Sequence, residues 1–383
     1  MFQEIDTKII QLNSFILSSK FKGGKIHGHI KNIKNIGFIE IVSEDGKKGY
    51  CENYHAVYSP EIFKAIVNFL QSKIIGKQIK DLRVINEANF IPFIARNGFI
   101  KSVLGSIELA LLDLVGKKLN KSVFDLLSLK NNKIKCYYSG GSVIMSPKDI
   151  EKDVEYCISQ KFFAYKMRLG FQPWKEDIKR ILKAKNILGN KTDIIFDTIM
   201  GTHKKIWSLN EAIRKIKILK KFNPMWVEEP LHPDDLDGYE NLKKKINTPI
   251  AAGEAYSGFL EYMTIIKKRL VNYIQLDITS SGGYSLSKKI SKIAKKNSIK
   301  IVPHCWGSDA TISANLLIAQ SNRNVPIFEI PSINLEISKY IAVDSFYIKD
   351  GYIQSTNNVG LGIEISKKVK SKFGYKKINS FSL

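Results

Sequence analysis

Acidic residues close a series of short, mostly apolar runs in the middle of the chain. Asp197, Glu228, Glu254 and Asp277 each end such a run, and the second run is stopped by Pro230. Short apolar runs of this kind are typical of buried parallel strands, and proline cannot continue a helix or donate to a strand ladder. We therefore expect each acid to lie at the carboxyl end of a strand.

Three stretches between these acids have the pattern of amphipathic helices: Ser208 to Phe222, Leu236 to Lys245, and Phe259 to Arg269. Alternating strands and helices predict a parallel sheet, and crossovers of one hand place all the carboxyl ends on one face. Acids that are distant in sequence should therefore meet in space. Crowded carboxylates repel one another unless a cation neutralises them, and oxygen ligands suit a hard ion such as Mg²⁺.

The same alternation extends from about residue 133 to about residue 330. It predicts an α/β fold of the (β/α)₈ type, a TIM-like barrel whose sites lie at the carboxyl ends of the strands. Asp197, Glu228 and Glu254 then end three neighbouring strands, which favours a shared metal site over separate roles as helix caps or ion pairs. The eight candidate strands are Ile134 to Ser139, Phe163 to Leu169, Asp193 to Asp197, Met225 to Glu229, Pro249 to Glu254, Tyr273 to Asp277, Ile299 to His304 and Val325 to Glu329.

Further polar residues fall at the ends of other predicted strands. Lys166 and Arg168 alternate, so they point to the same side, where two cations are costly unless they meet anions; the alternative is a pair of surface cations. His304 closes the seventh strand beside Asp277, which could orient the imidazole and raise its pKa for acid/base work, although a lone histidine is often structural. Glu329 ends the last strand and could hydrogen-bond a substrate oxygen.

The first 128 residues predict a separate α+β unit. Asp45-Gly46 indicates a hairpin turn between two strands. A helix predicted over Lys101 to Lys118 carries a broad apolar stripe that should dock on the next domain. The glycine-rich stretch Phe21 to His29 is either a mobile lid over the site or an exposed connection.

The tail also has hairpin character, with Asp350-Gly351 at its turn, and we expect it to rejoin the first unit. The predicted domains are an N-terminal capping domain over residues 1–128, a barrel over 129–335 and a C-terminal segment over 336–383.

Composition limits the possible partners and compartment. The net charge of +24 could indicate nucleic-acid binding, but the lysines are spread along the chain and no aromatic-basic recognition motif occurs. We therefore expect lysines on solvated helix faces, with a basic rim that attracts an anionic substrate. The four cysteines lack metal-ligand spacing, and no secretory or membrane-spanning run occurs, so we expect a soluble cytoplasmic protein that binds neither nucleic acid nor membrane.

The order of these motifs resembles the enolase superfamily, in its mandelate racemase/muconate lactonizing enzyme branch. Lys-x-Arg, Asp, Glu-Glu-Pro, Gly-Glu, Asp, His and Glu follow one another on successive predicted strands, and the resemblance covers nearly the whole chain. The segments 301–307, 328–329 and 359–364 are most similar to members that act on acid sugars and their lactones, such as acid-sugar dehydratases and galactarolactone cycloisomerase.

This resemblance implies a function for each candidate residue. It implies an enzyme that uses Mg²⁺, takes a small-molecule carboxylate as substrate and forms a homo-oligomer. It implies that Mg²⁺ is held by Asp197, Glu228 and Glu254 and that the His304–Asp277 dyad transfers the proton. It also implies that Lys166 and Arg168 lie on the other proton-transfer strand and that Glu329 lies beside the substrate carboxylate.

The chain departs from the family pattern in two places. Most racemizing relatives have Lys-x-Lys, whereas Arg168 holds the second position here, and a guanidinium is a poor base. A two-base racemase is therefore disfavoured. The usual Asp-x-Asn is also absent, because Thr198 and Ile199 follow Asp197, and a longer segment precedes the next helix.

The hypothesis is removal of the proton α to a substrate carboxylate. Mg²⁺, Lys166 and Arg168 would stabilise the enolate, and His304 would take the proton and then assist a β-leaving hydroxyl or lactone oxygen. The expected outcome is dehydration of an acid sugar or cycloisomerization of its lactone. Specificity should be set by the stretch Phe21 to His29, by Tyr54 to Tyr58 and by the region near Trp306. The alternatives are a racemase or epimerase of a hydroxy acid or amino-acid derivative, and a non-catalytic basic binding protein.

Overall fold

The barrel strands follow one another in chain order around the barrel. The structure, a computed structural model, describes residues 5–21, 32–85 and 97–377, so all of the stretch Phe21 to His29 except Phe21 lies outside the described residues. Parallel ladders join β4 through β10 in sequence order, and β11 pairs with β4. Between β10 and β11, the N–H of Ile301 donates to the carbonyl of Asn324 at 3.1 Å. The strands are β4 (Ile134–Ser139), β5 (Ala164–Arg168), β6 (Asp193–Asp197), β7 (Val227–Glu228), β8 (Ile250–Ala252), β9 (Tyr273–Ile274), β10 (Lys300–Ile301) and β11 (Phe328–Pro331).

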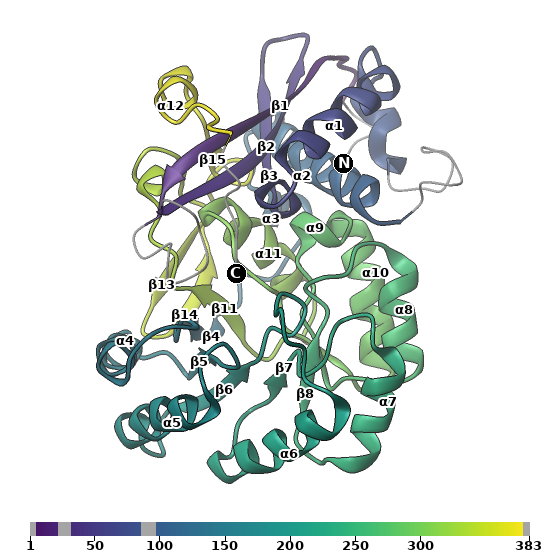
Figure 1. The fold of residues 1–383 in the computed structure, drawn as a ribbon. Helices are drawn as coiled ribbons and strands as arrows, with labels where there is room; N and C mark the ends of the chain where they lie inside the picture. The colour runs from purple at the N-terminus through teal and green to yellow at the C-terminus, as the bar shows by residue number, and fades with distance from the viewer. Residues whose placement is uncertain (1–4, 22–31, 86–96, 378–383) are drawn as a thin grey trace.

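Helices surround this sheet (Figure 1). The predicted (β/α)₈ barrel is therefore confirmed, and the three helices expected between the acids correspond to α6, α7 and α8. The helices are α4 (Pro147–Ser159), α5 (Trp174–Leu188), α6 (Leu209–Leu219), α7 (Leu236–Lys245), α8 (Phe259–Lys267), α9 (Ile278–Ser281), α10 (Gly283–Lys296) and α11 (Asp309–Ser321).

Several strands are shorter than the apolar runs that predicted them. The run from Met225 to Glu229 contributes only the two residues of β7, because Glu229 has a left-handed backbone (φ 41°) and Pro230 follows. The carboxyl ends of β8 and β9 also leave the ladder early. Glu254 and Asp277 consequently lie in the loops just past their strands.

An apolar layer fills the barrel directly beneath the polar strand ends. Because side chains alternate along a strand, every member of this layer except Ala251 lies two residues before a polar residue: Ala164 before Lys166, Trp226 before Glu228. Trp226 is fully buried and meets the ring of Tyr137 edge-on at 5.6 Å. The layer consists of Tyr137, Ala164, Ile195, Trp226, Ala251, Val302 and Ile327.

The N-terminal unit covers the barrel with an antiparallel sheet and helices (Figure 1). The hairpin expected around Asp45-Gly46 joins the second and third strands, and the expected helices are present. Helix α2 is buried over most of its length because it packs against both the sheet and the barrel helices α9 and α10. The elements are β1 (Ile9–Lys20), β2 (Ile33–Ser43), β3 (Lys48–Asn53), η4 (Tyr54–Val57), α1 (Pro60–Ile74), η5 (Ile79–Val84), α2 (Phe99–Leu119) and α3 (Val123–Leu126).

The C-terminal segment contacts both units. Its hairpin, β13 (Phe346–Lys349) and β14 (Tyr352–Ser355), pairs with barrel strand β4, where Tyr352 faces Lys135. Later residues reach the N-terminal sheet, since the backbone of Ser18 donates to the carbonyl of Phe373 at 2.8 Å. The remaining elements of this segment are η9 (Glu336–Lys339), β12 (Ala342–Val343), β15 (Ile363–Glu364) and α12 (Lys367–Lys372).

All four cysteines are buried and unpaired, as expected from their spacing. Within the described residues, no helix combines the length and apolarity that crossing a membrane requires.

Candidate active site

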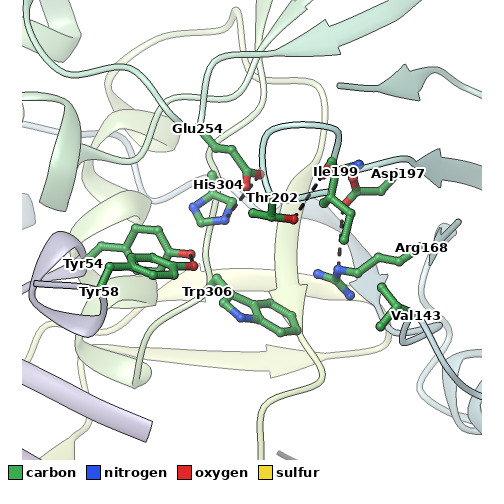
Figure 2. A pocket seen from close by; sticks show the side chains of 10 residues that line it. All are labelled: Tyr54, Tyr58, Val143, Arg168, Asp197, Ile199, Thr202, Glu254, His304 and Trp306. Carbon is green, nitrogen blue, oxygen red and sulfur yellow. Dashed lines mark hydrogen bonds and ion pairs between the residues drawn. The ribbon is translucent and has the colours of Figure 1, made fainter. Parts of the chain in front are cut away.

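A pocket opens where the carboxyl ends of the barrel strands face the N-terminal unit (Figure 2). It encloses about 510 Å³, part of it open to solvent. Barrel residues form its floor and one wall, and two tyrosines from the N-terminal unit form the opposite wall. The lining residues are Tyr54, Tyr58, Val143, Arg168, Asp197, Ile199, Thr202, Glu254, His304 and Trp306.

Lys166 lies below this floor, enclosed by carboxylates. Its Nζ atom is 2.7 Å from Oε1 of Glu228, 2.8 Å from Oε1 of Glu329 and 3.5 Å from Oδ2 of Asp197, and the side chain is 1% exposed. Burial alone would lower the pKa of Lys166, but the charges of Glu228 and Glu329 raise it well above the usual value. Lys166 is therefore a fixed ammonium ion and not a free base.

The three predicted metal ligands lie close to this floor, but they do not face one point. Two of them face Lys166 and the third faces His304. Glu228 and Asp197 face Lys166, whereas Oε2 of Glu254 lies 3.5 Å from Nε2 of His304. Among the described residues, no three acidic, histidine or cysteine side chains are already arranged around one point as metal ligands. Binding an ion would require these carboxylates to turn toward one another.

The chemistry of the donor set nevertheless fits a hard divalent cation. Burial, followed by the charge of Asp197, raises the pKa of Glu228 to about 7, and burial likewise raises the pKa values of Asp197 and Glu254. Neighbouring Glu229 is also buried, and its Oε1 atom has no hydrogen-bond partner among the described residues. This excess of buried carboxylate oxygen is what a divalent cation would neutralise.

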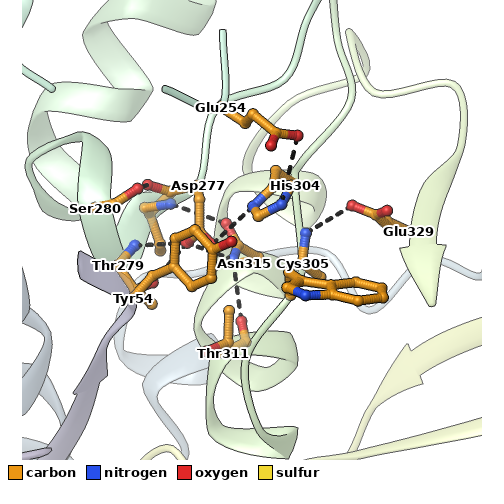
Figure 3. Close-up of polar contacts among 12 residues, drawn as sticks. Tyr54, Glu254, Asp277, Thr279, Ser280, His304, Cys305, Thr311, Asn315 and Glu329 are labelled. Carbon is orange, nitrogen blue, oxygen red and sulfur yellow. Dashed lines mark hydrogen bonds and ion pairs between the residues drawn. The ribbon is translucent and has the colours of Figure 1, made fainter. Parts of the chain in front are cut away.

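His304 and Asp277 form a hydrogen-bonded pair, as their adjacent strand ends predicted (Figure 3). Nδ1 of His304 is 3.3 Å from Oδ2 of Asp277. The other oxygen of Asp277, Oδ1, accepts hydrogen bonds from the backbone and hydroxyl of Thr279 and, at 2.9 Å, from Nδ2 of Asn315. Asp277 is thereby fixed, and Nε2 of His304 is left facing Glu254 and the pocket.

The electrostatics of this pair favour proton binding. Burial would lower the pKa of His304, but the charge of Glu254 and the hydrogen bond with Asp277 raise it to about 9. An ion bound by Glu254 would remove that charge from the surroundings of Nε2 and so lower the pKa of His304. The imidazole, oriented by a buried acid, would then be a suitable general base and, once protonated, a suitable general acid.

Arg168 forms the wall next to the floor and is firmly held. Its Nη1 donates to the carbonyl of Gly140 at 2.8 Å, and Nη2 donates to the hydroxyl of Ser139 at 3.0 Å. The guanidinium lies 4.1 Å from the ring centroid of Trp306. Arg168 therefore faces the pocket as a permanent cation supported by an aromatic ring.

The loop after β6 brings an apolar side chain into the pocket where the family pattern has asparagine. Ile199 has a left-handed backbone (φ 38°), and its N–H donates to Oδ1 of Asp197 at 3.0 Å. The hydroxyl of Thr198 lies 2.7 Å from the carbonyl of Glu229 and ties this loop to the end of β7. With Val143, Ile199 makes one side of the pocket apolar.

Two groups of site residues were not predicted from the sequence. Asn315 fixes Asp277, and a buried asparagine between apolar helix positions was its only signal. Val143 and Thr202 line the pocket from loops, where no periodic pattern marks them. Tyr54 and Tyr58 were expected near the substrate; their hydroxyl oxygens are 2.9 Å apart, and the ring of Tyr54 lies 5.0 Å from that of His304.

Comparisons with known proteins show the family of the chain and its fold. The sequence profile of the family described as "Enolase C-terminal domain-like" matches residues 149–369. The chain is 25% identical to arabinonate dehydratase of Saccharolobus solfataricus over 353 residues, which cover 91% of this chain and 93% of that protein. It is also 25% identical to D-galactarolactone cycloisomerase of Agrobacterium fabrum, with coverage of 88% and 90%.

A solved structure is similar over almost the whole chain. The 3,6-anhydro-D-galactonate cycloisomerase of Zobellia galactanivorans superposes with a TM-score of 0.83 at 25% identity, covering 96% of this chain and 100% of that one. The similarity therefore includes the N-terminal unit as well as the barrel.

Proposed function

Since the chain belongs to the enolase C-terminal domain-like family, we propose that it removes the proton α to the carboxylate of an acid sugar or sugar lactone and expels a β-oxygen. It is an enzyme of the enolase superfamily, and the curated relatives it matches over most of their length are dehydratases and a cycloisomerase. These names support an elimination or ring-opening reaction on a sugar-derived acid.

The observation that carries the proposal is the one-sided distribution of bases around the pocket. His304, backed by Asp277, is the imidazole that lines the cavity. Across the pocket from His304 lies Arg168, which stays protonated. Lys166 lies beneath the floor in three ion pairs. A single base supports elimination, whereas inversion of a stereocentre needs a second base on the other face.

The substrate carboxylate would be held at the floor. Asp197, Glu228 and Glu254 would bind a Mg²⁺ ion, which supplies Lewis-acid stabilisation of negative charge on carboxylate oxygens when bound. Arg168 adds a fixed positive charge at the adjacent wall, so charge that develops on the substrate meets a cation already in place. The buried Lys166 compensates the charges of Glu228 and Glu329 below.

The proton follows a short path through His304. Nε2 takes the α proton as the C–H bond breaks, and its electron pair forms the enolate. Asp277, through Oδ2, accepts the Nδ1–H and stabilises the imidazolium. The imidazolium then gives the proton to the β oxygen as the C–O bond breaks and the enolate electron pair forms the new C=C bond. An acid sugar loses water in this step, whereas a lactone opens and its ring oxygen becomes part of a carboxylic acid; the enol that remains becomes the 2-keto acid.

Exchange of the α proton with D₂O tests this assignment. Acid sugars and their lactones are screened with Mg²⁺ in D₂O, and deuterium incorporation is followed by NMR. We expect His304→Asn to abolish exchange, since His304 is the only imidazole among the described residues that line the pocket and the lining carboxylates Asp197 and Glu254 are assigned to the metal ion. His232→Asn, at a partly exposed surface histidine, is the matched control and should retain exchange.

Two results would contradict the proposal. Exchange that persists in His304→Asn would assign the base to Lys166 instead. A product that is the C2 epimer of the substrate, without loss of a β-oxygen, would favour the racemase alternative.

A further inference from the structure

The loop that follows His304 is fixed by three buried charged side chains. Oε2 of Glu329 accepts the N–H of Cys305 at 2.8 Å. Nζ of Lys34 donates to the carbonyl of Trp306, and Oε2 of Glu52 accepts the N–H of Ser308 at 3.0 Å. The loop from Cys305 to Ser308 therefore has a charged partner on most of its successive residues.

Two of these partners come from the N-terminal unit and not from the barrel. Lys34 lies on β2 and Glu52 on β3, and both side chains are 0% exposed. Neither residue lines the pocket, so neither is in a position to touch the substrate. Their hydrogen bonds cross the boundary between the two units and end on the loop that begins at the base.

Keeping such charges buried is costly. Burial lowers the pKa of Lys34 to about 7 and raises that of Glu52, although the two charges favour each other. Apolar residues of similar volume often replace a buried ion pair at no loss of stability. Stability alone therefore does not account for Lys34 and Glu52 at these positions.

Trp306 links this pair to the pocket. Lys34 lies 5.4 Å from the centroid of the Trp306 ring, and the guanidinium of Arg168 lies 4.1 Å from the same centroid. Trp306 lines the pocket and is two residues from His304. A shift of the Trp306 carbonyl would therefore move the Trp306 ring and the backbone at His304, and it would change the contact between that ring and the guanidinium of Arg168.

We propose that Lys34 and Glu52 are positioning residues, through which the N-terminal unit holds the loop from Cys305 to Ser308 and so sets the orientation of His304 and Trp306. This inference rests on the proposed function, in which His304 is the base. It assigns the N-terminal unit a part in catalysis beyond covering the substrate.

The test compares Lys34→Met with Lys34→Arg, which keeps a donor to the Trp306 carbonyl, and with Glu52→Gln, which keeps the size of the side chain. Lys215→Met is the matched control, because Lys215 is also buried and lies 4.0 Å from a tryptophan centroid, that of Trp207, in the outer helical layer. Two measurements are made on each variant. The first is the NMR signal of ¹³C-labelled His304 without substrate, which is identified because it is lost in His304→Asn. The second is the kinetics of α-proton exchange.

We expect Lys34→Met to shift or broaden the His304 signal and to lower kcat for exchange roughly 10- to 100-fold with little change in KM, because a small misplacement of a base costs that much. Lys34→Arg should restore much of the rate, Glu52→Gln should give an intermediate loss, and Lys215→Met should leave both measurements unchanged.

A His304 signal and a kcat that both stay at wild-type values in Lys34→Met and Glu52→Gln would overturn the inference. If Lys34→Met does not fold, the isosteric Glu52→Gln decides by the same criteria. The NMR measurement also separates the two proposals: a displaced His304 signal in a protein that exchanges no acid-sugar α proton supports the positioning role and rejects the proposed reaction.

Discussion

At the scale of single residues, burial determines what each ionisable group can do. Lys166 and Arg168 share one face of a strand, as the alternation of the sequence predicted, yet the first lies under the floor and the second lines the pocket. Because the two residues are two positions apart on the same strand, their side chains lie in successive layers inside the barrel. The sequence predicted that Lys166 and Arg168 lie on the same face of the strand. It could not predict how deeply each side chain lies below the pocket floor, because that depends on where the neighbouring carboxylates lie.

His55 gives a pH dependence of stability. Burial lowers the pKa of His55 to about 4, and its Nδ1 has no hydrogen-bond partner among the described residues. In the unfolded chain a histidine takes up its proton near pH 6.5. Between these values the unfolded state binds more protons, so the free energy of unfolding should fall as the pH drops from 6.5 to 4.

We expect this contribution to reach on the order of 2 kcal/mol at pH 4, reduced somewhat because the ring is partly exposed. Urea unfolding at a series of pH values measures it. His55→Phe, which keeps a ring against Phe99, should flatten the curve in this window, and His232→Asn should not. An unchanged slope in His55→Phe would show that His55 is already protonated in the folded protein.

At the scale of elements, the barrel strands were predictable and their lengths were not. The apolar runs and the acids that close them located β6 and β7, and the spacing of the acids indicated that they would meet. The ladders stop early because the backbone turns at residues such as Glu229 (φ 41°), and a one-dimensional pattern of apolar residues carries no information on φ. For the same reason the conformation of the loop after β6 could not be foreseen.

Ile199 in that loop should be strained. A β-branched residue with φ 38° is costly, whereas asparagine adopts this region readily. We expect Ile199→Asn to be at least as stable as the wild type, despite the loss of an apolar side chain. Ile199→Val, which keeps the strain and removes a methylene group, should be less stable than Ile199→Asn by about 1 kcal/mol. Urea unfolding of the three proteins measures this; an Asn variant below the Val variant would contradict the argument.

At the scale of the whole molecule, two units and their order along the chain could be inferred, but not every contact of the tail. The tail was expected to rejoin the N-terminal unit, and its later residues reach that sheet, where Ser18 bonds to Phe373 and Leu17 bridges to Gly374. The hairpin around Asp350-Gly351 pairs with β4 of the barrel, which the sequence did not predict. A hairpin pattern in the sequence indicates the turn but not the strand with which the hairpin pairs. Here the hairpin pairs with Ile134 and Lys135, the part of β4 that precedes its ladder with β11.

The contact between the two units depends on glycine at position 105. A Cβ atom there would lie 2.1 Å from the backbone nitrogen of Gly283, so helix α2 could not keep its present distance from α10. We expect Gly105→Ala to lower the free energy of unfolding by about 1 to 3 kcal/mol, although alanine is the better helix former. Gly374→Ala, where the nearest atoms are 3.7 Å away, should be nearly neutral. Urea unfolding distinguishes the two, and an equal effect would argue against a close contact.

Two contacts join early parts of the chain to much later parts. β11 pairs with β4, and the backbone of Ser18 bonds to Phe373 near the C-terminal end of the described chain. During synthesis, the first strands therefore leave the ribosome well before their last partners exist. The nascent polypeptide has to keep β1 and β4 from pairing with other chains until β11 and Phe373 have been synthesised, so a chain cut before β11 should aggregate and not form a smaller folded protein.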